Sequence, residues 1–342
     1  MDAITLAAID RCIRCRISFI AYALPGERDV TFFANPSAGI GSDSANATIS
    51  FFGHAANSVS ISAELDAGEV LKTDLRRHHD PEITPYVRST DRKSHHIAVE
   101  RIVERLRNDG GKTVLSRTIA GQRRSDDWRP VIESVFEKST FAFRFVYYTH
   151  TTGCWLGASP ELLGSIDSNC IFSTMALAGT RTNGEPWDSK NREEHQFVID
   201  YITEKLTSAG LRPTVGKEET VTCGPVEHLR HIISASVKES SLSFSDIINR
   251  LSPTPALAGY PLGPALLDIS LNEAHPRYCY GGYIALHLPD GTSRAYVNLR
   301  SCHFHDRHYC IYAGGGITAQ SDPAIEWDET EAKASAILSS IT

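Results

Sequence analysis

The order of strand-like and helical segments is the feature that most constrains the fold of this chain. Runs of β-branched and aromatic residues predict strands at residues 17–22, 30–33, 48–52, 113–119, 141–148, 154–158, 170–174, 282–287, 294–300 and 308–313. Apolar residues three or four positions apart predict helices at 95–108, 127–137, 190–208, 243–249 and 323–340. These segments do not alternate as the βαβ units of a parallel sheet. The sequence therefore predicts an α+β fold with large antiparallel sheets and helices packed outside them.

Length and composition are those of a compact protein. At 342 residues the chain is long enough to bury a sizeable core. A hydrophobic content of 41% with 22% charged residues is typical of soluble globular proteins. No linker-like stretch stands out. We therefore expect one compact domain over residues 1–342, in which residues 1–90 form an N-terminal sheet-forming region.

Charge and hydropathy argue against several kinds of partner. The net charge of -7 and a pI near 6.1 disfavour nucleic acid as the main partner. No apolar run reaches the ~18 residues that a membrane span needs. The first residues lack the basic segment of a signal peptide. We expect a cytoplasmic protein that binds neither membranes nor nucleic acid.

Eight cysteines raise the question of a metal site. Cys12 and Cys15 form a C-x-x-C motif, but no second pair stands at zinc-finger spacing. Residues 302–310 combine two cysteines with three histidines, and we interpret them as a polar hairpin turn between two strands. Reduced thiols in a cytosolic protein are the expected state.

The predicted last helix carries an unusual set of charges. Glu326, Glu329 and Lys333 fall at i, i+3 and i+7 and therefore line one stripe. The neighbouring apolar residues, which indicate that this face points inward, are Ala332, Ala336 and Ile337. Half-buried charges cost several kcal/mol unless they are compensated, and a divalent cation with an anionic ligand would compensate them. The alternative is a solvated Glu–Lys pair, which is common on surface helices.

A second carboxylate lies on the apolar stripe of the predicted helix 190–208. Glu194 shares a face with Phe197, Val198 and Tyr201. Mg²⁺ prefers one or two carboxylates together with water and ligand oxygens, so Glu194 is a candidate ligand. The alternative is a carboxylate held by a nearby arginine or lysine.

Three further charged residues lie at the ends of predicted strands. Lys112 follows a glycine turn at a strand start, where apolar surroundings and nearby cations would lower its pKa enough for it to act as a base. Glu161 follows Pro160 between apolar residues, which would raise its pKa and make it a proton donor near neutral pH. Arg300 ends a strand and is suited to clamping a carboxylate. For each of them a solvated or purely structural role remains open.

Taken in order, these motifs resemble the chorismate-utilising enzymes, which include isochorismate and salicylate synthases and the large subunits of anthranilate and aminodeoxychorismate synthases. The resemblance covers about residues 95–340, the expected catalytic region. It implies a sandwich of large antiparallel sheets. The segments that carry it are Ser159–Leu162, Ala178–Arg181, Glu194–His195, Pro253–Ala256, Gly281–Gly282, Arg300, Ala313–Ile317 and Glu326–Glu329 with Lys333.

The resemblance implies a role for each matching residue. Mg²⁺ would be held by Glu194 and Glu329, with Glu326 supporting it through water. Lys112 would activate the water that attacks C2 of chorismate, and Glu161 would protonate the departing C4 hydroxyl. Substrate contacts would come from Gly179, Thr180, Ala256, Arg300, Gly314 and Lys333.

Fewer residues decide the branch of the family. Lys112 is similar to the base of the isochorismate and salicylate synthases, and Ala178 stands where aminodeoxychorismate synthases have a nucleophilic lysine. The resemblance therefore favours isochorismate synthase, for menaquinone or siderophore biosynthesis, as a monomer or weak dimer with no obligatory glutaminase subunit. The alternatives are salicylate synthase, an anthranilate-synthase-like component I and a non-catalytic chorismate-binding protein. Ser252 replaces the usual histidine of a His-Pro-Thr motif, and Leu257 and Tyr280 are expected to shape the pocket.

Overall fold

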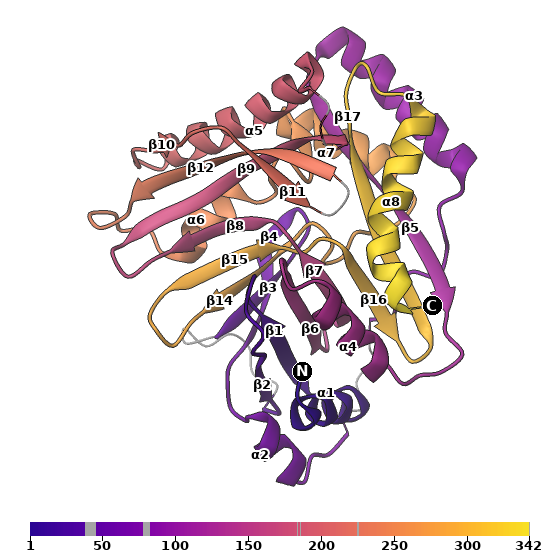
Figure 1. Cartoon of the computed structure of the whole chain (residues 1–342), viewed down its shortest axis with the longest axis vertical. Helices are drawn as coiled ribbons and strands as arrows, with labels where there is room; N and C mark the ends of the chain where they lie inside the picture. The colour runs from indigo at the N-terminus through magenta and orange to yellow at the C-terminus, as the bar shows by residue number, and fades with distance from the viewer. Residues whose placement is uncertain (38–45, 78–82, 183, 185, 224–225, 342) are drawn as a thin grey trace.

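The structure is a computed structural model that describes residues 1–37, 46–77, 83–182, 184, 186–223 and 226–341. In these residues the strands form two large antiparallel sheets with helices outside them, so the predicted fold class is confirmed (Figure 1). The first sheet has the spatial order β13 (Gly259–Tyr260), β5 (Lys112–Gln122), β17 (His308–Ile317), β16 (Ser301–His305), β7 (Gly153–Ser159), β6 (Phe143–Thr149), β1 (Ser18–Ala23) and β2 (Thr31–Asn35).

The second sheet is also antiparallel, and its strands likewise come from distant parts of the chain. Its order is β10 (Thr214–Val215), β12 (Val226–Ser236), β9 (Ile171–Thr182), β8 (Leu162–Ile166), β15 (Ser293–Val297), β14 (Tyr283–His287), β3 (Ala47–Phe51) and β4 (His54–Ile61), with β11 (Glu219–Cys223) also paired to β12. Residues 18–61 thus supply edge strands to both sheets. The division into residues 1–90 and 95–340 stays a prediction.

Alternating side chains build the core between the sheets. Phe143, Phe145 and Tyr147 of β6 point inward, and they belong to one buried cluster with Ile284 and Leu286 of β14. The residues between them on β6 pack on the opposite face instead. This period of two is what a strand buried on both faces requires.

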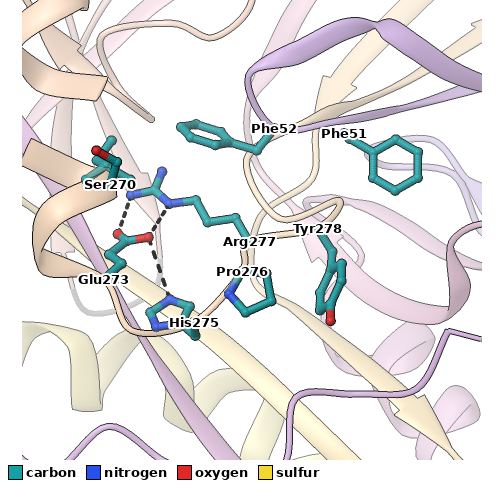
Figure 2. A pocket seen from close by; sticks show the side chains of 9 residues that line it. Phe51, Phe52, Ser270, Glu273, His275, Pro276, Arg277 and Tyr278 are labelled. Carbon is teal, nitrogen blue, oxygen red and sulfur yellow. Dashed lines mark hydrogen bonds and ion pairs between the residues drawn. The ribbon is translucent and has the colours of Figure 1, made fainter. Parts of the chain in front are cut away.

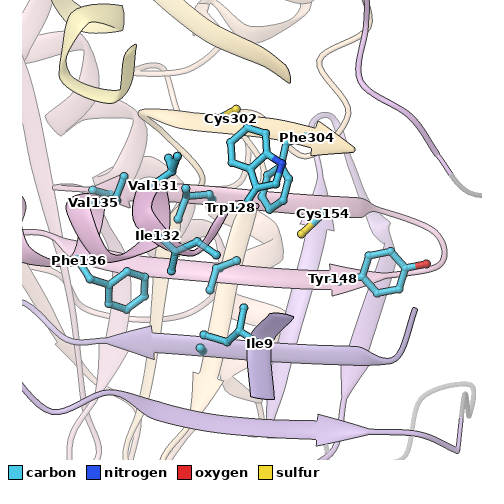
Figure 3. Close-up of a cluster of buried hydrophobic side chains, with 14 of the residues drawn as sticks. Ile9, Trp128, Val131, Ile132, Val135, Phe136, Tyr148, Cys154, Cys302 and Phe304 are labelled. Atoms are coloured by element: carbon cyan, nitrogen blue, oxygen red, sulfur yellow. The ribbon is translucent and has the colours of Figure 1, made fainter. Parts of the chain in front are cut away.

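Helices cover both outer faces. The first sheet is covered by α1 (Ala3–Cys15), α4 (Arg129–Lys138) and α8 (Pro323–Ile341), whose apolar cluster is drawn in part in Figure 3. The second sheet is covered by α5 (Ser189–Ser208) and α6 (Phe244–Leu251). Smaller contacts are made by α2 (Ala67–Lys72) with α1, by α3 (Arg92–Asp109) with α8, and by α7 (Leu262–Asn272) with β5.

Two of the connections that cross between the sheets, here called corners, lie side by side. Pro160 and Glu161 join β7 of the first sheet to β8 of the second, and residues 298–300 join β15 to β16. The Val297 amide donates to the Glu161 carbonyl at 3.1 Å, and the Ala158 amide donates to the Arg300 carbonyl at 3.2 Å. The corners are therefore tied to each other by backbone hydrogen bonds.

Several local predictions are wrong. The strand predicted at 294–300 ends at Val297, and Arg300 has a left-handed φ of 46° because the chain turns there between sheets. Residues 302–310 form a hairpin as predicted, but its turn is confined to residues 306–307, and residues 301–305 form β16, which is buried on both faces. On α8, Ala332 and Ala336 are exposed, and the buried residues are Glu326, Thr330, Ala334, Ile337 and Ile341.

Candidate functional site

Two adjoining cavities in the described part of the chain lie where β5, β9, β17 and α8 meet. The first, of about 100 Å³, is lined by Lys112, Val114, Ala178, Gly179, Asn191, Ala256, Gly314, Gly315, Gly316, Glu329 and Lys333. The second, of about 120 Å³, is lined by Val114, Pro160, Glu161, Leu177, His228, Ala256, Leu257, Tyr280, Leu299, Arg300, Tyr312, Ala313, Gly314 and Lys333. Val114, Ala256, Gly314 and Lys333 line both, so the cavities share a wall.

Lys112 begins β5 and lines the first cavity with only 2% of its surface exposed. The preceding Gly111 has a φ of 90°, and a Cβ there would meet the Tyr260 carbonyl oxygen at 2.2 Å. Only glycine fits this position, because other residues combine a left-handed strain with a clash. The glycine turn therefore allows β13 to close over the start of β5 beside the lysine.

Glu161 lies at the corner between the sheets and lines the second cavity. Burial raises the pKa of its carboxyl group to about 7, although Lys112 and Lys333 favour the charged form. Glu161 thus holds a proton for much of the time near neutral pH. The positive charge of Lys112 lowers this pKa, although the two side chains line different cavities.

His228 of β12 also lines the second cavity, and no expectation from the sequence included it. Its Nδ1 lies 3.0 Å from the Gly179 carbonyl oxygen, which only accepts, so Nδ1 carries a proton. Burial lowers the pKa of the ring, and the cations Lys333 and Arg300 act in the same direction. A neutral imidazole therefore faces the cavity, with Nε2 as an acceptor.

The predicted stripe on α8 is present. Lys333 Nζ lies 2.6 Å from Glu329 Oε1 and donates to the Gly314 carbonyl at 3.0 Å. Both side chains are about one-third exposed. The pair faces the shared end of the cavities rather than open solvent. It is an ion pair at the wall of the first cavity, so it combines the two interpretations that the sequence allowed.

Glu326 lies deeper than its neighbours, with 3% of its surface exposed. Its Oε1 accepts a hydrogen bond of 2.6 Å from the Ser321 hydroxyl. A Cβ added to Gly315 would lie 3.1 Å from Glu326 Oε2 and 3.9 Å from Glu329 Oε1. Two carboxylates of α8 therefore lie close to the Cα of Gly315, on the side where another residue would have its side chain.

Other predicted residues divide into three groups. Gly179, Ala256 and Arg300 line the cavities, as do Leu257 and Tyr280. The side chains of Glu194 and Thr180 lie outside the described residues. Ser252 ends α6 and does not line either described cavity.

The described residues contain no group of three or more histidine, cysteine, aspartate or glutamate side chains placed to hold a metal ion. The described part of the chain also has no helix that is long and apolar enough to span a membrane. Cys12 lies buried on α1, and His303 is buried on β16, stacked on Trp155 at 4.8 Å. Within residues 302–310, the buried side chains Cys302, His303 and Cys310 belong to the protein interior.

The sequence pattern of the family described as chorismate binding enzyme matches residues 44–342. Isochorismate synthase MenF of Pasteurella multocida is 32% identical over 213 residues, which are 58% of this chain and 49% of that protein. The chloroplastic isochorismate synthase of Catharanthus roseus is 30% identical over 267 residues, which are 72% of this chain and 45% of that protein. The chain thus spans about half the length of these curated relatives.

A solved structure is similar over the whole chain. MenF, the menaquinone-specific isochorismate synthase of Escherichia coli, matches with a TM-score of 0.76 at 20% identity, covering 100% of this chain and 92% of that one. At this level of identity the likeness concerns the fold. It is an independent confirmation of the two-sheet architecture described above.

Proposed function

The chain belongs to the chorismate-binding enzymes, and on that premise we propose that it converts chorismate to isochorismate. The observation that carries the proposal is that Lys112 and Glu161 line two adjoining cavities that have four lining residues in common. A base on one side and a protonated acid on the other are what the exchange of a ring hydroxyl requires. Similarity to isochorismate synthases supports the choice of reaction.

The acid has the protonation state that the reaction needs. Glu161 protonates the C4 hydroxyl as it leaves, and a pKa of about 7 keeps a proton available near neutral pH. Lys112 removes a proton from the water that attacks C2, and the double bonds shift between the two carbons. Each of these proton transfers is worth about 10²–10⁴ in rate.

The substrate is a dianion, and the cavities offer cations for it. Arg300 lines the second cavity and is suited to bind one carboxylate through paired hydrogen bonds. Lys333 lines both cavities and, although paired with Glu329, adds positive charge to their shared wall. The small residues Gly179, Ala256 and Gly314 leave room for a ring between these groups.

The residues of α8 fit a magnesium ion in part. Glu326 and Glu329 converge on Gly315, which leaves a gap that a side chain would fill. Glu329 would hold Mg²⁺ together with Glu194 of α5, and Glu326 would support the ion through water. A bound Mg²⁺ supplies positive charge that stabilises the substrate's ring carboxylate and the charge developed on the ring.

Product analysis tests the proposal. Purified protein is incubated with chorismate and Mg²⁺, and the products are separated by chromatography. We expect isochorismate from the wild type and a rate lower by about 10²–10⁴ from Lys112→Ala, with folding unchanged. A folded wild type that yields no product would favour a non-catalytic chorismate-binding protein.

Other products would identify another branch. Salicylate formed at an enzymatic rate without an added lyase would mean that the protein also expels pyruvate. Anthranilate formed only when ammonium is supplied would mean an anthranilate-type enzyme. Isochorismate formed without ammonium or a glutaminase contradicts that branch. A gene deletion tests the pathway: loss of menaquinone would indicate one role, and loss of a siderophore would indicate the other.

A further inference from the structure

A buried ion pair stands directly behind the wall of the catalytic cavities. Glu273 caps the C-terminus of α7, and Arg277 follows four residues later. Their side chains are 2% and 3% exposed. Figure 2 shows them facing each other, with His275 beside the carboxylate. Burying two charges costs several kcal/mol per ion, and apolar residues of similar size often serve stability as well or better. Stability alone therefore does not account for the pair.

The hydrogen bonds of the pair join three segments of the chain. The Arg277 guanidinium donates twice to Glu273, at 2.8 and 2.5 Å. It also donates to the carbonyls of Leu257 and Val114, each at 2.7 Å. Glu273 Oε1 accepts the Ser116 amide at 2.6 Å. The pair thus links β5 and the segment before β13 to the end of α7.

These bonds supply partners for backbone groups on the edge of β5 that faces away from β17. One edge of β5 pairs with β17, but on its other edge β13 reaches only Lys112 and Thr113. Beyond that point, the Val114 carbonyl and the Ser116 amide are bound by the side chains of Arg277 and Glu273. Backbone groups of a buried edge need such partners, and here side chains supply them.

The fixed backbone is the wall of the site. Val114 lines both cavities, Leu257 lines the second, and Lys112 lies two residues before Val114 on the same strand. We propose that Glu273 and Arg277 are positioning residues, which hold β5 and Leu257 so that Lys112 and the cavity wall keep their places. This proposal rests on the proposed function for its kinetic consequence only.

The pair can be replaced without leaving a buried charge. The double variant Glu273→Gln with Arg277→Met keeps the volume and removes both charges. We expect it to fold with a melting temperature below that of the wild type, because the Val114 and Leu257 carbonyls lose their donor. At a temperature where the variant stays folded, kcat should fall at least about tenfold, since small misplacements of reacting groups are costly. A folded double variant with the wild-type kcat would overturn the proposal.

Chemical rescue separates positioning from general stability. A cavity of about 520 Å³ lies on the outer side of the pair, lined by Phe51, Phe52, His275 and Tyr278 among others, so a small cation can reach the space left by Arg277→Ala. We expect guanidinium to restore part of the kcat of this variant, and sodium at equal concentration not to. Failure of guanidinium to restore any kcat in the folded variant would contradict the assignment.

Arg144→Ala is the matched control. Arg144 is also buried, and it donates to the carbonyls of Phe136 and Leu24 at 3.0 Å each; none of these three residues lines either cavity. Its loss should lower the melting temperature while kcat stays near the wild-type value and does not respond to guanidinium. A loss of kcat equal to that of Arg277→Ala would show that any buried arginine matters equally, which would overturn the proposal.

Hydrogen exchange tests the positioning without relying on turnover or on the folding of a variant. In the wild type, the Ser116 amide should exchange as slowly as the amides that bond within the sheet, because it is bound to a buried carboxylate. Fast exchange at Ser116 would overturn the proposal. If the wild type fails to turn over chorismate while Ser116 is protected, the proposed function fails and the structural assignment stands.

Discussion

Glu161 is the residue at which burial and chemistry are most closely connected. Burial raises the pKa of its carboxyl group to about 7, so the proton donor of the proposed reaction is lost as the pH rises through that value. We expect kcat/KM to fall on the alkaline side with this midpoint. Glu161→Gln should lower kcat by about 10²–10⁴, measured with chorismate at neutral pH.

The same substitution, Glu161→Gln, should lower activity but not stability at alkaline pH. A carboxyl group whose pKa is raised by folding stabilises the folded state most in acid and loses this contribution as the pH rises through about 7. Glu161→Gln should therefore unfold at the same or a higher temperature than the wild type at alkaline pH. A clear drop in melting temperature there would argue that the buried group is already ionised and paired.

Arg300 combines a strained backbone with a charge that faces the second cavity. Arg300→Lys keeps the charge but loses paired hydrogen bonds, and Arg300→Gly also relieves a left-handed φ that costs about 1 kcal/mol for a residue with a Cβ. We expect KM for chorismate to rise about 10–100-fold in both, with Arg300→Gly at least as stable as wild type. An unchanged KM in steady-state kinetics would remove Arg300 from substrate binding.

Residue spacing predicted some of these positions and missed others for a clear reason. Glu326, Glu329 and Lys333 were readable because helical periodicity is regular over many turns. His228 was not, because β12 has a register shift between His228 and Leu229. Such a bulge interrupts the alternation that would reveal the strand, and it re-aims the side chain toward the cavity. The run of small residues at Gly179, which accepts from His228, was the available signal.

At the scale of elements, the approach of α8 to β17 depends on glycine. An alanine at Gly315 would place its Cβ 3.1 Å from Glu326 Oε2, so the carboxylate must move. We expect Gly315→Ala to raise the Mg²⁺ concentration for half-maximal activity at least about tenfold, the range found for disturbed metal surroundings. The measurement is a magnesium titration of the initial rate.

Gly263 provides the control for this prediction. It lies in α7, and a Cβ there would meet no atom within 4 Å. Gly263→Ala should leave the magnesium dependence unchanged, and its gain in helix propensity is small because Pro264 restricts the residue before it. If both alanine variants shift the titration equally, the effect does not arise at the carboxylates.

Helix α7 was absent from the predicted elements, although its C-cap residue Glu273 belongs to the buried ion pair behind the cavities. Its apolar pattern is broken, since Leu267 and Leu271 are exposed while Asp268 is buried against Arg105. Helical periodicity assumes that apolar residues face the core and charged residues face water, and here a buried aspartate paired with an arginine from α3 reverses that assumption. Tertiary pairing of this kind is outside what local spacing can indicate.

At the scale of the whole molecule, two buried histidines make the fold sensitive to acid. Burial lowers the pKa of His303 to about 3 and that of His95 to about 4. Both must take up a proton on unfolding once the pH falls below the unfolded value of ~6.5. Their contribution to stability is present above that pH and is lost as the pH falls toward 4.

His95→Phe isolates one of these groups. The ring meets Trp327 edge-on at 5.4 Å, and its nitrogens have no hydrogen-bond partner among the described residues. Phenylalanine can keep this packing without titrating. We expect the variant to resist urea better than wild type in acid and equally at neutral pH. Parallel losses of stability in both proteins would point to other groups.

The overall class of the fold was predictable because strand and helix periods are local, but the assignment of strands to sheets was not. Neighbours in the first sheet such as β5 and β17 are far apart in sequence, and the pairing is set by long-range burial. Whether residues 1–90 and 95–340 behave as separate regions stays a prediction.

The two side-by-side corners between the sheets have a mechanical consequence. Their backbones are bonded to each other through Glu161 with Val297 and through Ala158 with Arg300. If the layers of the sandwich shift against each other, these bonds keep Glu161 and Arg300 together, so under the proposed function the proton donor and the residue that binds a substrate carboxylate move as one body. The distance between these two residues is thereby set by the backbone of the two corners, so the proposed function requires a substrate whose C4 hydroxyl and bound carboxylate match that distance.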